Sequence, residues 1–410
     1  MNNKKNGIPK LRFPGFTGAW EQRKLGEITS VITKGTTPLD KSGKGSINFV
    51  KVEDLSPDNS GINVHSMISK EEHEGRLKRS ILKENDILFS IAGTLGRIGI
   101  VKSEILPANT NQALAIVRLK EGNLSYISTV LEGRTVREYI RQNPTVGAQP
   151  NLSLKQVSEL RISFPTLQEQ EQVGNFFNKL NSFIALHQRK LEHLQEQKKG
   201  LLQKMFPKNG ETVPEVRFPG FTDAWEQRKW VDSINISNEM VDPTTGKFDD
   251  MPHIAPGNIE SFTGRILDNV KTVKEEELIS GKFLFKPGDV VFGKINPQLG
   301  KYFYARVEGL TSADSYVLNG KNKNITQMFI FLLLQTRDFF KYSVSVSKRS
   351  GIPKINREEL NGFKFLIPCK EEQEKIGDFF LNIDSLIALH QRKLDHLELM
   401  KKGLLQQMFV

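Results

Sequence analysis

Two long stretches of the chain carry apolar residues at the spacing of a coiled-coil helix. The first runs from Gln168 to Phe206, contains no proline and lies between Pro165 and Pro207. Its apolar positions step by four and then three residues, which is the heptad pattern of helices that pair along a seam. A second stretch, within 369–410, repeats the pattern. The residues expected to pair the helices are Leu180, Ile184, Leu191 and Leu194 in the first and Ile383, Ile387, Leu394 and Leu397 in the second.

Four polar residues interrupt this seam. His187 and His390 occupy core positions, where a histidine most often fixes the register of the helices or is partly buried with its polar atoms satisfied. We therefore expect neither to bind a metal or to act in catalysis. Lys198 and Lys401 are expected to extend outward to solvent. The alternative is that each helix packs separately on its own globular domain, but strict stepping over several heptads favours pairing.

Short apolar runs typical of β-strands precede each helix. In the first half they include Ile47–Val52 and Ala113–Val117, and a turn at Lys83–Asp86 leads into Ile87–Phe89. In the second half the turn and the run that follows it recur at Lys286–Phe292. Runs of this kind between turn residues indicate strands. We therefore predict two mixed α/β domains of about 140 residues each, which is an ordinary domain size.

The chain contains an internal duplication. Arg12–Arg23 recurs as Arg217–Arg228 with one difference, and Ile184–Leu191 recurs as Ile387–Leu394. The offsets are 205 (217 − 12) and 203 (387 − 184) residues, so both blocks keep their order and nearly their spacing. A duplication of this kind indicates two units built on one plan. It divides the chain into a first domain over 1–165, a first helix over 166–206, a linker over 207–216, a second domain over 217–368 and a second helix over 369–410.

The linker limits how the two helices can pair. A helix of about 38 residues is about 57 Å long, whereas the linker Pro207–Glu215 spans at most about 30 Å. With parallel helices, the second domain would have to begin near the start of the first helix, beyond the reach of the linker. We therefore predict an α+β fold in which two mixed α/β domains are separated by a long antiparallel two-helix coiled coil and are related by a pseudo-two-fold axis.

Composition favours a polyanionic partner. The 410 residues include 58 Lys and Arg against 47 Asp and Glu, a formal charge of +11, and basic proteins of this kind often bind nucleic acid. The single cysteine, Cys369, excludes a disulfide framework and a cysteine-based zinc site, and it fits a reducing cytoplasm. The N-terminus lacks the apolar stretch of a secretory signal. The longest apolar run, Met328–Leu334, is too short to span a bilayer and indicates a buried helix.

The motifs of catalysis are missing from the sequence. The Gly-x-x-x-x-Gly-Lys-Ser/Thr phosphate loop is absent, and so is a glycine-rich methyltransferase cofactor loop. Asn296-Pro297-Gln298-Leu299 lacks the second proline and the aromatic residue of the amino-methyltransferase motif, so we interpret it as a loop. The seven histidines do not have the spacing of metal ligands. We therefore expect no catalytic residue and no metal site in this chain.

The duplicated blocks resemble a known family. The paired Phe-Pro-Gly-Phe…Ala-Trp-Glu-Gln-Arg blocks and the Glu-Gln-Glu…Leu-His-Gln-Arg-Lys-Leu helices are similar, over essentially the full length, to the specificity subunit of type I restriction–modification systems. Gly35–Pro38 resembles the opening loop of its target-recognition domains. The resemblance implies that each domain reads one half of a bipartite, asymmetric target in double-stranded DNA. It further implies that the helices set the spacer between the halves and dock two methyltransferase subunits.

The same resemblance assigns the chemistry to partners. The methyltransferase subunits would carry S-adenosylmethionine and methylate adenine, and separate motor-nuclease subunits would restrict DNA. The chain itself would be non-catalytic and would need no cofactor, and we expect it to be cytoplasmic.

Candidate DNA contacts lie on polar loops at corresponding places in the two halves, because Lys and Arg bind phosphates while Arg, Gln, Asn, Ser and Thr read bases. A plain solvated loop is the alternative for each residue. Two other functions remain open: a coiled-coil scaffold with two non-DNA ligand-binding domains, and the DNA-reading part of a fused restriction–modification enzyme. The candidates are Lys34, Thr36, Arg97 and Gln149 in the first half and Lys294, Asn296, Lys348, Arg349 and Ser350 in the second.

Overall fold

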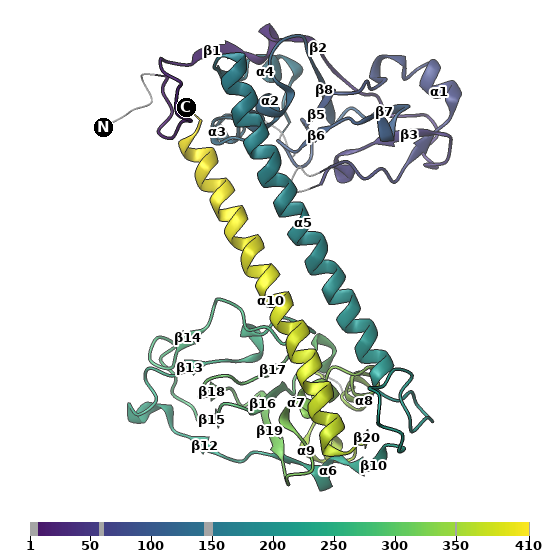
Figure 1. Cartoon of the computed structure of the whole chain (residues 1–410), viewed down its shortest axis with the longest axis vertical. Helices are drawn as coiled ribbons and strands as arrows, with labels where there is room; N and C mark the ends of the chain where they lie inside the picture. The colour runs from purple at the N-terminus through teal and green to yellow at the C-terminus, as the bar shows by residue number, and fades with distance from the viewer. Residues whose placement is uncertain (1–6, 57–60, 143–150, 349–350, 410) are drawn as a thin grey trace. The chain divides into compact units, whose positions relative to one another are not determined.

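The chain forms two compact units that each contain one copy of the duplicated plan. The structure is a computed structural model, and it describes residues 7–56, 61–142, 151–348 and 351–409. Unit 1 combines Met1–Lys190 with His390–Val410, and unit 2 comprises Leu191–Leu389. Each unit holds one mixed α/β domain together with one segment of each of two long helices (Figure 1).

Unit 1 contains two small sheets and a strand pair. The four-stranded antiparallel sheet has the order β2-β8-β5-β6, and in the three-stranded sheet β4-β3-β7 the strands β3 and β7 are parallel. The pair β1–β9 joins the first repeated block to the strand that leads into the long helix. The elements are β1 Glu21–Lys24, β2 Thr29–Lys34, β3 Ile47–Val50, β4 Met67–Ile68, α1 Lys70–Glu74, β5 Ile87–Ser90, β6 Ile98–Ile100, β7 Ala108–Thr110, β8 Leu114–Leu119, α2 Leu124–Leu131, α3 Arg134–Gln142, α4 Leu154–Ser158 and β9 Arg161–Phe164.

Unit 2 repeats this plan with a larger second sheet. The order β11-β19-β16-β17 matches β2-β8-β5-β6, and the strand pair β10–β20 matches β1–β9. In the five-stranded sheet β12-β15-β18-β13-β14 the strands β13 and β18 are parallel, as β3 and β7 are. The elements are β10 Glu226–Lys229, α6 Trp230–Ser233, β11 Ile234–Ile236, β12 Met240–Val241, β13 Pro252–His253, β14 Lys271–Thr272, β15 Lys282–Phe285, β16 Val290–Gly293, β17 Tyr302–Tyr304, β18 Gly309–Thr311, β19 Ser315–Gly320, α7 Gln327–Leu333, α8 Arg337–Val346, α9 Arg357–Asn361 and β20 Lys364–Ile367.

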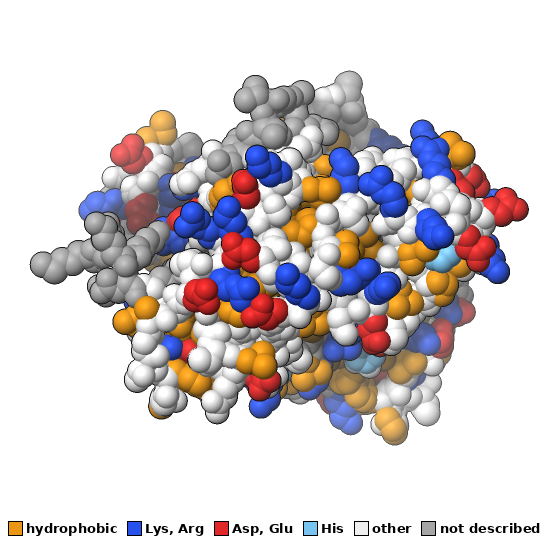
Figure 2. Space-filling model, turned by 90° about the horizontal axis from the view of Figure 1, so that it is seen from above, with side chains coloured by type: hydrophobic (Ala, Val, Ile, Leu, Met, Phe, Trp, Pro, Cys, Tyr) orange, Lys and Arg blue, Asp and Glu red, His pale blue; other side chains and the backbone are white. Residues whose placement is uncertain are grey.

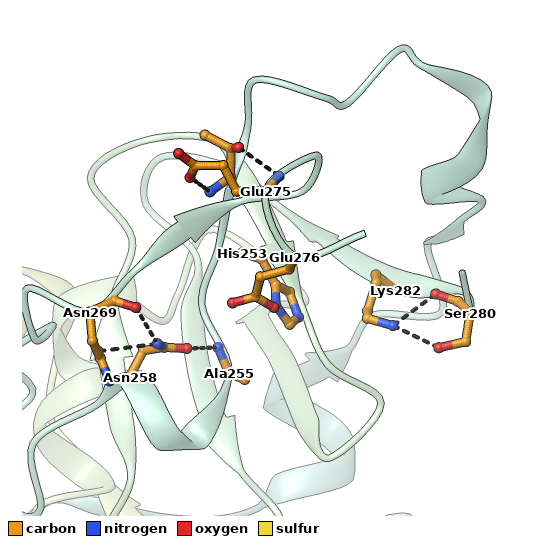
Figure 3. A network of polar contacts seen from close by, with 9 residues as sticks. His253, Ala255, Asn258, Asn269, Glu275, Glu276, Ser280 and Lys282 are labelled. Carbon is orange, nitrogen blue, oxygen red and sulfur yellow. Dashed lines mark hydrogen bonds and ion pairs between the residues drawn. The ribbon is translucent and has the colours of Figure 1, made fainter. Parts of the chain in front are cut away.

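A buried polar network holds the five-stranded sheet of unit 2 (Figure 3). His253 on β13 is buried, and its Nδ1 lies 2.6 Å from a carboxylate oxygen of Glu276. The buried Lys282 at the start of β15 donates to both oxygens of Ser280. These contacts give His253 Nδ1 and the Lys282 ammonium polar partners, which lowers the cost of burying them; among the described residues the buried His253 Nε2 has no hydrogen-bond partner. The contacts therefore tie β13 to the segment after β14 and fix the start of β15.

The two predicted coiled-coil helices are confirmed within one to three residues at each end. They are α5, Leu167–Met205, and α10, Lys370–Gln407. Residues 167–190 of α5 and 390–407 of α10 lie in unit 1, and the remaining segments lie in unit 2. Within each unit the two segments lie side by side and run in opposite directions (Figure 1). None of the described helices is long and apolar enough to cross a bilayer.

The eight predicted pairing residues face the seam to different extents. Leu180, Ile184, Leu191 and Leu394 are buried, whereas Leu194, Ile383, Ile387 and Leu397 are half-buried. Near the C-terminal end of each helix, Leu202 and Leu405 are buried, whereas the preceding residues Leu201 and Leu404, which continue the heptad spacing, are half-buried. Leu202 belongs to the hydrophobic core of unit 2, so here the globular domain, and not the partner helix, decides which face is buried.

The expectation that Lys198 and Lys401 extend into solvent is wrong. Lys198 Nζ lies 2.6 Å from a carboxylate oxygen of Asp384 on the facing helix segment of unit 2. Lys401 Nζ lies 2.8 Å from a carboxylate oxygen of Glu132 at the end of α2 in unit 1. The two lysine side chains are only 12% and 14% exposed. A neighbouring carboxylate supplies the counter-charge that lets each ammonium stay in the packed interface.

The seam histidines pair with each other. His187 Nδ1 lies 2.8 Å from His390 Nδ1 within unit 1. Burial lowers the pKa of His187, and the positive charges on His390, Lys393 and Lys190 lower it further. The pair can share one hydrogen bond only while at least one imidazole is neutral. This arrangement is consistent with the expected role in register and partial burial.

The histidine pair predicts a loss of stability on acidification. Because the pKa of His187 is depressed in the folded state, the unfolded chain binds more protons below the ordinary histidine pKa of about 6.5, and stability falls as the pH falls through that value. We expect the melting temperature of unit 1 to drop more between pH 7.5 and 5.5 in the native chain than in His390→Leu. Calorimetry at both pH values measures this, and equal drops in the two proteins would contradict it.

The duplicated residues build the frame of each unit. Arg12 donates from Nε and Nη2 to the two carboxylate oxygens of Glu169 at 2.7 and 2.8 Å, and Arg217 repeats this geometry on Glu372 at 2.7 Å for both bonds. Gln170 and Gln373, the next residue in each helix, donate to the carbonyls of Pro165 and Pro368, respectively. The repeated Glu-Gln pair therefore fastens the start of each long helix to its own repeat block.

The C-terminal ends of the long helices are also fastened in matching ways. Phe206, just after α5, lies in the aromatic core of unit 2, with ring centroids 5.5 Å from Trp225 and 5.4 Å from Phe329. Phe409, just after α10, makes the matching contacts in unit 1 with Trp20 and with Tyr126. Each unit thus combines the start of one long helix with the end of the other.

Candidate nucleic-acid interface

The predicted contact residues of unit 1 gather at one end of its four-stranded sheet. Lys34 is the last residue of β2 and pairs with Ala115, which is near the start of β8. Phe89, near the end of β5, pairs with the same Ala115, and β6 begins at Ile98 immediately after Arg97. The loops that follow β2 and β5 and precede β8 and β6 therefore emerge at the same edge.

The first of these loops depends on a glycine. A Cβ on Gly35 would lie 1.8 Å from the carbonyl oxygen of Thr110, so no other residue fits there without moving the backbone. The close approach allows the backbone N–H of Thr36 to donate to that carbonyl at 3.3 Å. Thr37 Oγ1 then donates to Gln112 Oε1 at 2.6 Å. Unit 1 thus presents the exposed Lys34 beside uncharged hydroxyl and amide groups.

Arg97 holds part of this edge together. Its side chain is half-buried, and its Nη1 donates to the Leu55 carbonyl at 3.4 Å. Its backbone N–H donates to Ser90 Oγ at 2.7 Å, which closes the loop between β5 and β6. Gln149, the fourth predicted contact of this unit, lies outside the described residues. Arg97 therefore has a structural contact that the sequence did not indicate.

The same edge of unit 2 has the same backbone frame. The N–H groups of Ile91 and Lys294 donate to the carbonyls of Ala113 and Asp314 at 2.8 and 2.9 Å. The carbonyls of Ile91 and Lys294 accept from Leu152 and Ile355, respectively. The isolated bridges Ala92–Asn151 and Ile295–Lys354 follow directly in the two units. Two divergent sequences therefore fold into one frame at this edge.

Unit 2 places a group of positive charges on this frame. Lys294 Nζ lies 5.2 Å from the centroid of the Tyr316 ring, and the Arg357 guanidinium lies 5.6 Å from the same ring. Arg357 is held in place because it donates to the carbonyls of Ile236 and Ser237 at 3.0 and 2.8 Å. Burial lowers the pKa of Lys294, Asp314 opposes the shift, and the positive charges of Lys354 and Arg357 add to it.

The charge of this group is unbalanced. Among the described residues, no carboxylate lies within ion-pair distance of Lys294, Lys354 or Arg357, and Asp314 is exposed. Lys294 and Arg357 are half-buried and Lys354 is exposed. Partly buried cations without counter-ions cost stability, and such sites are candidates for binding an anion. The group therefore suits a polyanion such as DNA.

Of the other residues predicted for unit 2, Asn296 lies beside this group. Asn296 has a left-handed backbone, with φ +47°, and its N–H donates to the Pro353 carbonyl at 2.7 Å. Its side-chain oxygen accepts from Gln298 at 3.3 Å. Lys348 is exposed just beyond α8. Arg349 and Ser350 lie outside the described residues.

Sequence reasoning missed Thr37, Gln112, Tyr316, Lys354 and Arg357. Lys354 comes directly after Pro353 and Arg357 four residues after it, so a candidate loop drawn a few residues longer would have included both. No local signal marks Tyr316 or Gln112, because each reaches the edge through strand pairing with a distant segment.

Surface charge alone does not locate the interface. On the face drawn in Figure 2, Lys and Arg side chains are interspersed with acidic and apolar ones, without one continuous basic stripe. Within the described residues, no group of three or more His, Cys, Asp or Glu is placed to hold a metal ion. The interface is therefore defined by the shared loop edge and by its local charge.

Comparison with known proteins identifies what the chain is similar to. A family model described as "Type I restriction modification DNA specificity domain" matches residues 18–196 and 225–399. The type I restriction enzyme EcoDI specificity subunit of Escherichia coli is 24% identical over 283 residues, which cover 63% of this chain and 60% of that subunit. The MjaVIII specificity subunit of Methanocaldococcus jannaschii is 23% identical over 411 residues, covering 94% of this chain and 91% of the relative.

Solved structures share the fold. The crystal structure of a type I restriction-modification system S subunit from M. genitalium superposes with a TM-score of 0.62 at 14% identity, covering 98% of this chain and 99% of that one. The two matched segments of the family model contain the two α/β domains and most of both long helices.

Proposed function

Because the chain belongs to the family of type I restriction–modification DNA specificity proteins, we propose that each unit reads one half of a bipartite, asymmetric target in double-stranded DNA. The loop edge described above carries this proposal. Both units use the same backbone hydrogen bonds there, yet the side chains differ: hydroxyl and amide groups with Lys34 in unit 1, cations around Tyr316 in unit 2. A shared frame with different side chains is what two readers of different half-sites require.

Catalysis is assigned to partner subunits. In this proposal the methyltransferase subunits bind S-adenosylmethionine and methylate adenine, motor-nuclease subunits cleave DNA, and this chain supplies neither activity nor a cofactor site. The long helices set the spacer between the half-sites. The unbalanced cation group favours this function over a scaffold for two uncharged ligands, because such a scaffold gives no reason to keep positive charge without counter-ions.

A pair of matched apolar patches supports docking of two methyltransferase subunits. Phe183 and Leu186 on α5 are 55% and 40% exposed, although they belong to long helices whose other faces are buried. Leu386 and Leu389 on α10, at the same offset of 203 residues, are 46% and 38% exposed. Exposed apolar residues that recur at equivalent positions indicate two equal protein contacts. Two copies of one partner fit this repetition.

Introducing a charge into one patch tests this docking. We expect Phe183→Glu to weaken binding of one methyltransferase copy by at least roughly 10-fold, because a carboxylate would be buried in an apolar contact. Native mass spectrometry should then show complexes with one methyltransferase per chain in place of two. The control is Leu399→Glu, since Leu399 is 69% exposed and its counterpart in the other helix is already Glu196. Two copies retained in Phe183→Glu would exclude this patch.

Methylation mapping tests the function as a whole. DNA from cells that express this chain with its partner methyltransferase should carry methyl groups in one bipartite motif with two different halves. Binding to that motif should weaken steeply with salt, as for proteins that displace counter-ions from phosphates. Absence of sequence-specific methylation, or affinity that is insensitive to salt, would reject the proposal.

A further inference from the structure

We propose that Lys294 reads a guanine in the half-site bound by unit 2. The inference rests on the proposed function and deepens it, since it assigns a base to a side chain. Three observations support it. Lys294 has a fixed position, its side-chain donors are unpaired among the described residues, and three positions that are apolar in unit 1 are polar or aromatic here.

Lys294 is held in a defined place. Its backbone is clamped on both sides, because its N–H donates to the Asp314 carbonyl and its carbonyl accepts from Ile355 N–H at 3.0 Å. Its side chain is half-buried over the Tyr316 ring. That ring is fixed in turn by the bond from its hydroxyl to the Ile355 carbonyl at 3.2 Å. A lysine that only neutralises phosphate has no need of such a support, whereas base readout needs a positioned donor.

The ammonium of Lys294 is available for a ligand. Among the described residues, no hydrogen-bond acceptor or carboxylate is paired with its Nζ. Arg357, the other cation at the ring, has donors committed to two backbone carbonyls. Of the two partly buried cations, Lys294 is therefore the one with no side-chain donor committed to a partner among the described residues.

The equivalent positions in unit 1 have different side chains at this point but keep the same backbone hydrogen bonds. Ile91 takes the place of Lys294 with the same backbone bonds. Strand pairing puts Ala115 opposite Phe89, as it puts Tyr316 opposite Phe292. The first residue of α4 is Leu154, where α9 begins with Arg357. A cation, an aromatic ring and an arginine thus replace three apolar residues at one point of a common frame, which marks it as a position that carries specificity.

The chemistry of a lysine selects guanine. An ammonium group has three donors and no acceptor. In the major groove guanine presents two adjacent acceptors, N7 and O6, whereas adenine, cytosine and thymine add a donor or a methyl group to their edges. A fixed lysine therefore favours guanine over the other bases.

The test is methylation mapping with the complete methyltransferase complex, comparing the native chain with Lys294→Gln. We expect one fixed guanine, in one half of the motif, to become degenerate or to change to adenine, which glutamine reads with its amide. Discrimination for guanine at that position should fall roughly 10- to 100-fold. The other half of the motif should stay unchanged, and the melting temperature should not fall, because removal of a partly buried unpaired charge offsets the lost contact with the Tyr316 ring.

Control variants and modified DNA separate the outcomes. Lys286→Gln replaces an exposed lysine of the same unit that pairs with Glu239, and it should leave the motif intact. In the native complex, 7-deazaguanine at the assigned position should weaken binding, since it lacks the N7 acceptor. A uniform loss of methylation with an unchanged motif would make Lys294 a phosphate contact and overturn the inference. If the native chain itself gives no bipartite motif, the proposed function fails instead.

Discussion

Replacing Phe206 by alanine is expected to lower the free energy of unfolding of unit 2 by about 3–5 kcal/mol, the usual range for truncating a buried phenylalanine. Phe206 is 8% exposed and stacks on Phe329 while contacting Trp225 edge-on. Its loss leaves a cavity at the point where the end of α5 enters the core of the second α/β domain. Calorimetry of the full chain should show the transition of unit 2 moving to lower temperature.

The matched variant Phe409→Ala serves as the control. Phe409 touches Trp20, Tyr126 and Phe177 with centroids 5.7–6.2 Å apart, but it is half-buried and ends the described chain. We expect a smaller loss, about 1–2 kcal/mol, confined to unit 1, since less apolar area leaves contact with the core. If Phe409→Ala were the more damaging change, the structural role given to Phe206 would be wrong.

The long helices could be predicted because their pattern is local. Heptad spacing and flanking prolines placed the first helix at Gln168–Phe206, against Leu167–Met205 in the structure. The apolar run Met328–Leu334 is the buried helix α7 with its ends shifted by one residue. The turn before Ile87–Phe89 leads into β5, as expected. In each case nearby residues supply the signal, so no knowledge of distant contacts is needed.

The candidate site was only partly predictable because distant segments complete it. The loops at Lys34 and Lys294 follow recognisable strands and stand at the expected edge. Strand pairing brings the contact partners of these loops into place: Gln112 for Thr37 and Tyr316 for Lys294. The error at Lys401 has the same origin: its carboxylate partner, Glu132, is remote in sequence, and a heptad pattern says nothing about which domain covers a helix. The heptad period predicts which face of a helix is buried, whereas tertiary packing decides which residues contact that face.

The repeated Glu-Gln motif predicts an unequal response of the two units to the same substitution. Glu169→Gln is expected to lower the stability of unit 1 by roughly 3 kcal/mol, because it leaves the 14%-exposed Arg12 without its counter-charge. It also removes the carboxylate oxygen that accepts from Trp20 Nε1 at 3.1 Å. The amide nitrogen of the glutamine would place N–H donors opposite the N–H donors of Arg12 and Trp20.

Glu372→Gln should lower the stability of unit 2 by roughly 1 kcal/mol less than Glu169→Gln lowers that of unit 1. This difference is the net value of one hydrogen bond. Glu372 accepts two bonds from Arg217 at 2.7 Å, but the buried Trp225 Nε1 has no hydrogen-bond partner within the part of the chain that the structure describes. Hydrogen exchange of β1 and β9 in Glu169→Gln, compared with β10 and β20 in Glu372→Gln, measures the two losses separately. An equal increase in exchange would mean that the tryptophan bond adds nothing to the frame of unit 1. The expected inequality would mean that the bond from Trp20 to Glu169 outweighs a second difference between the copies: Arg12 Nη1 also donates to the Gly18 carbonyl, whereas Arg217 Nη1 has no hydrogen-bond partner among the described residues.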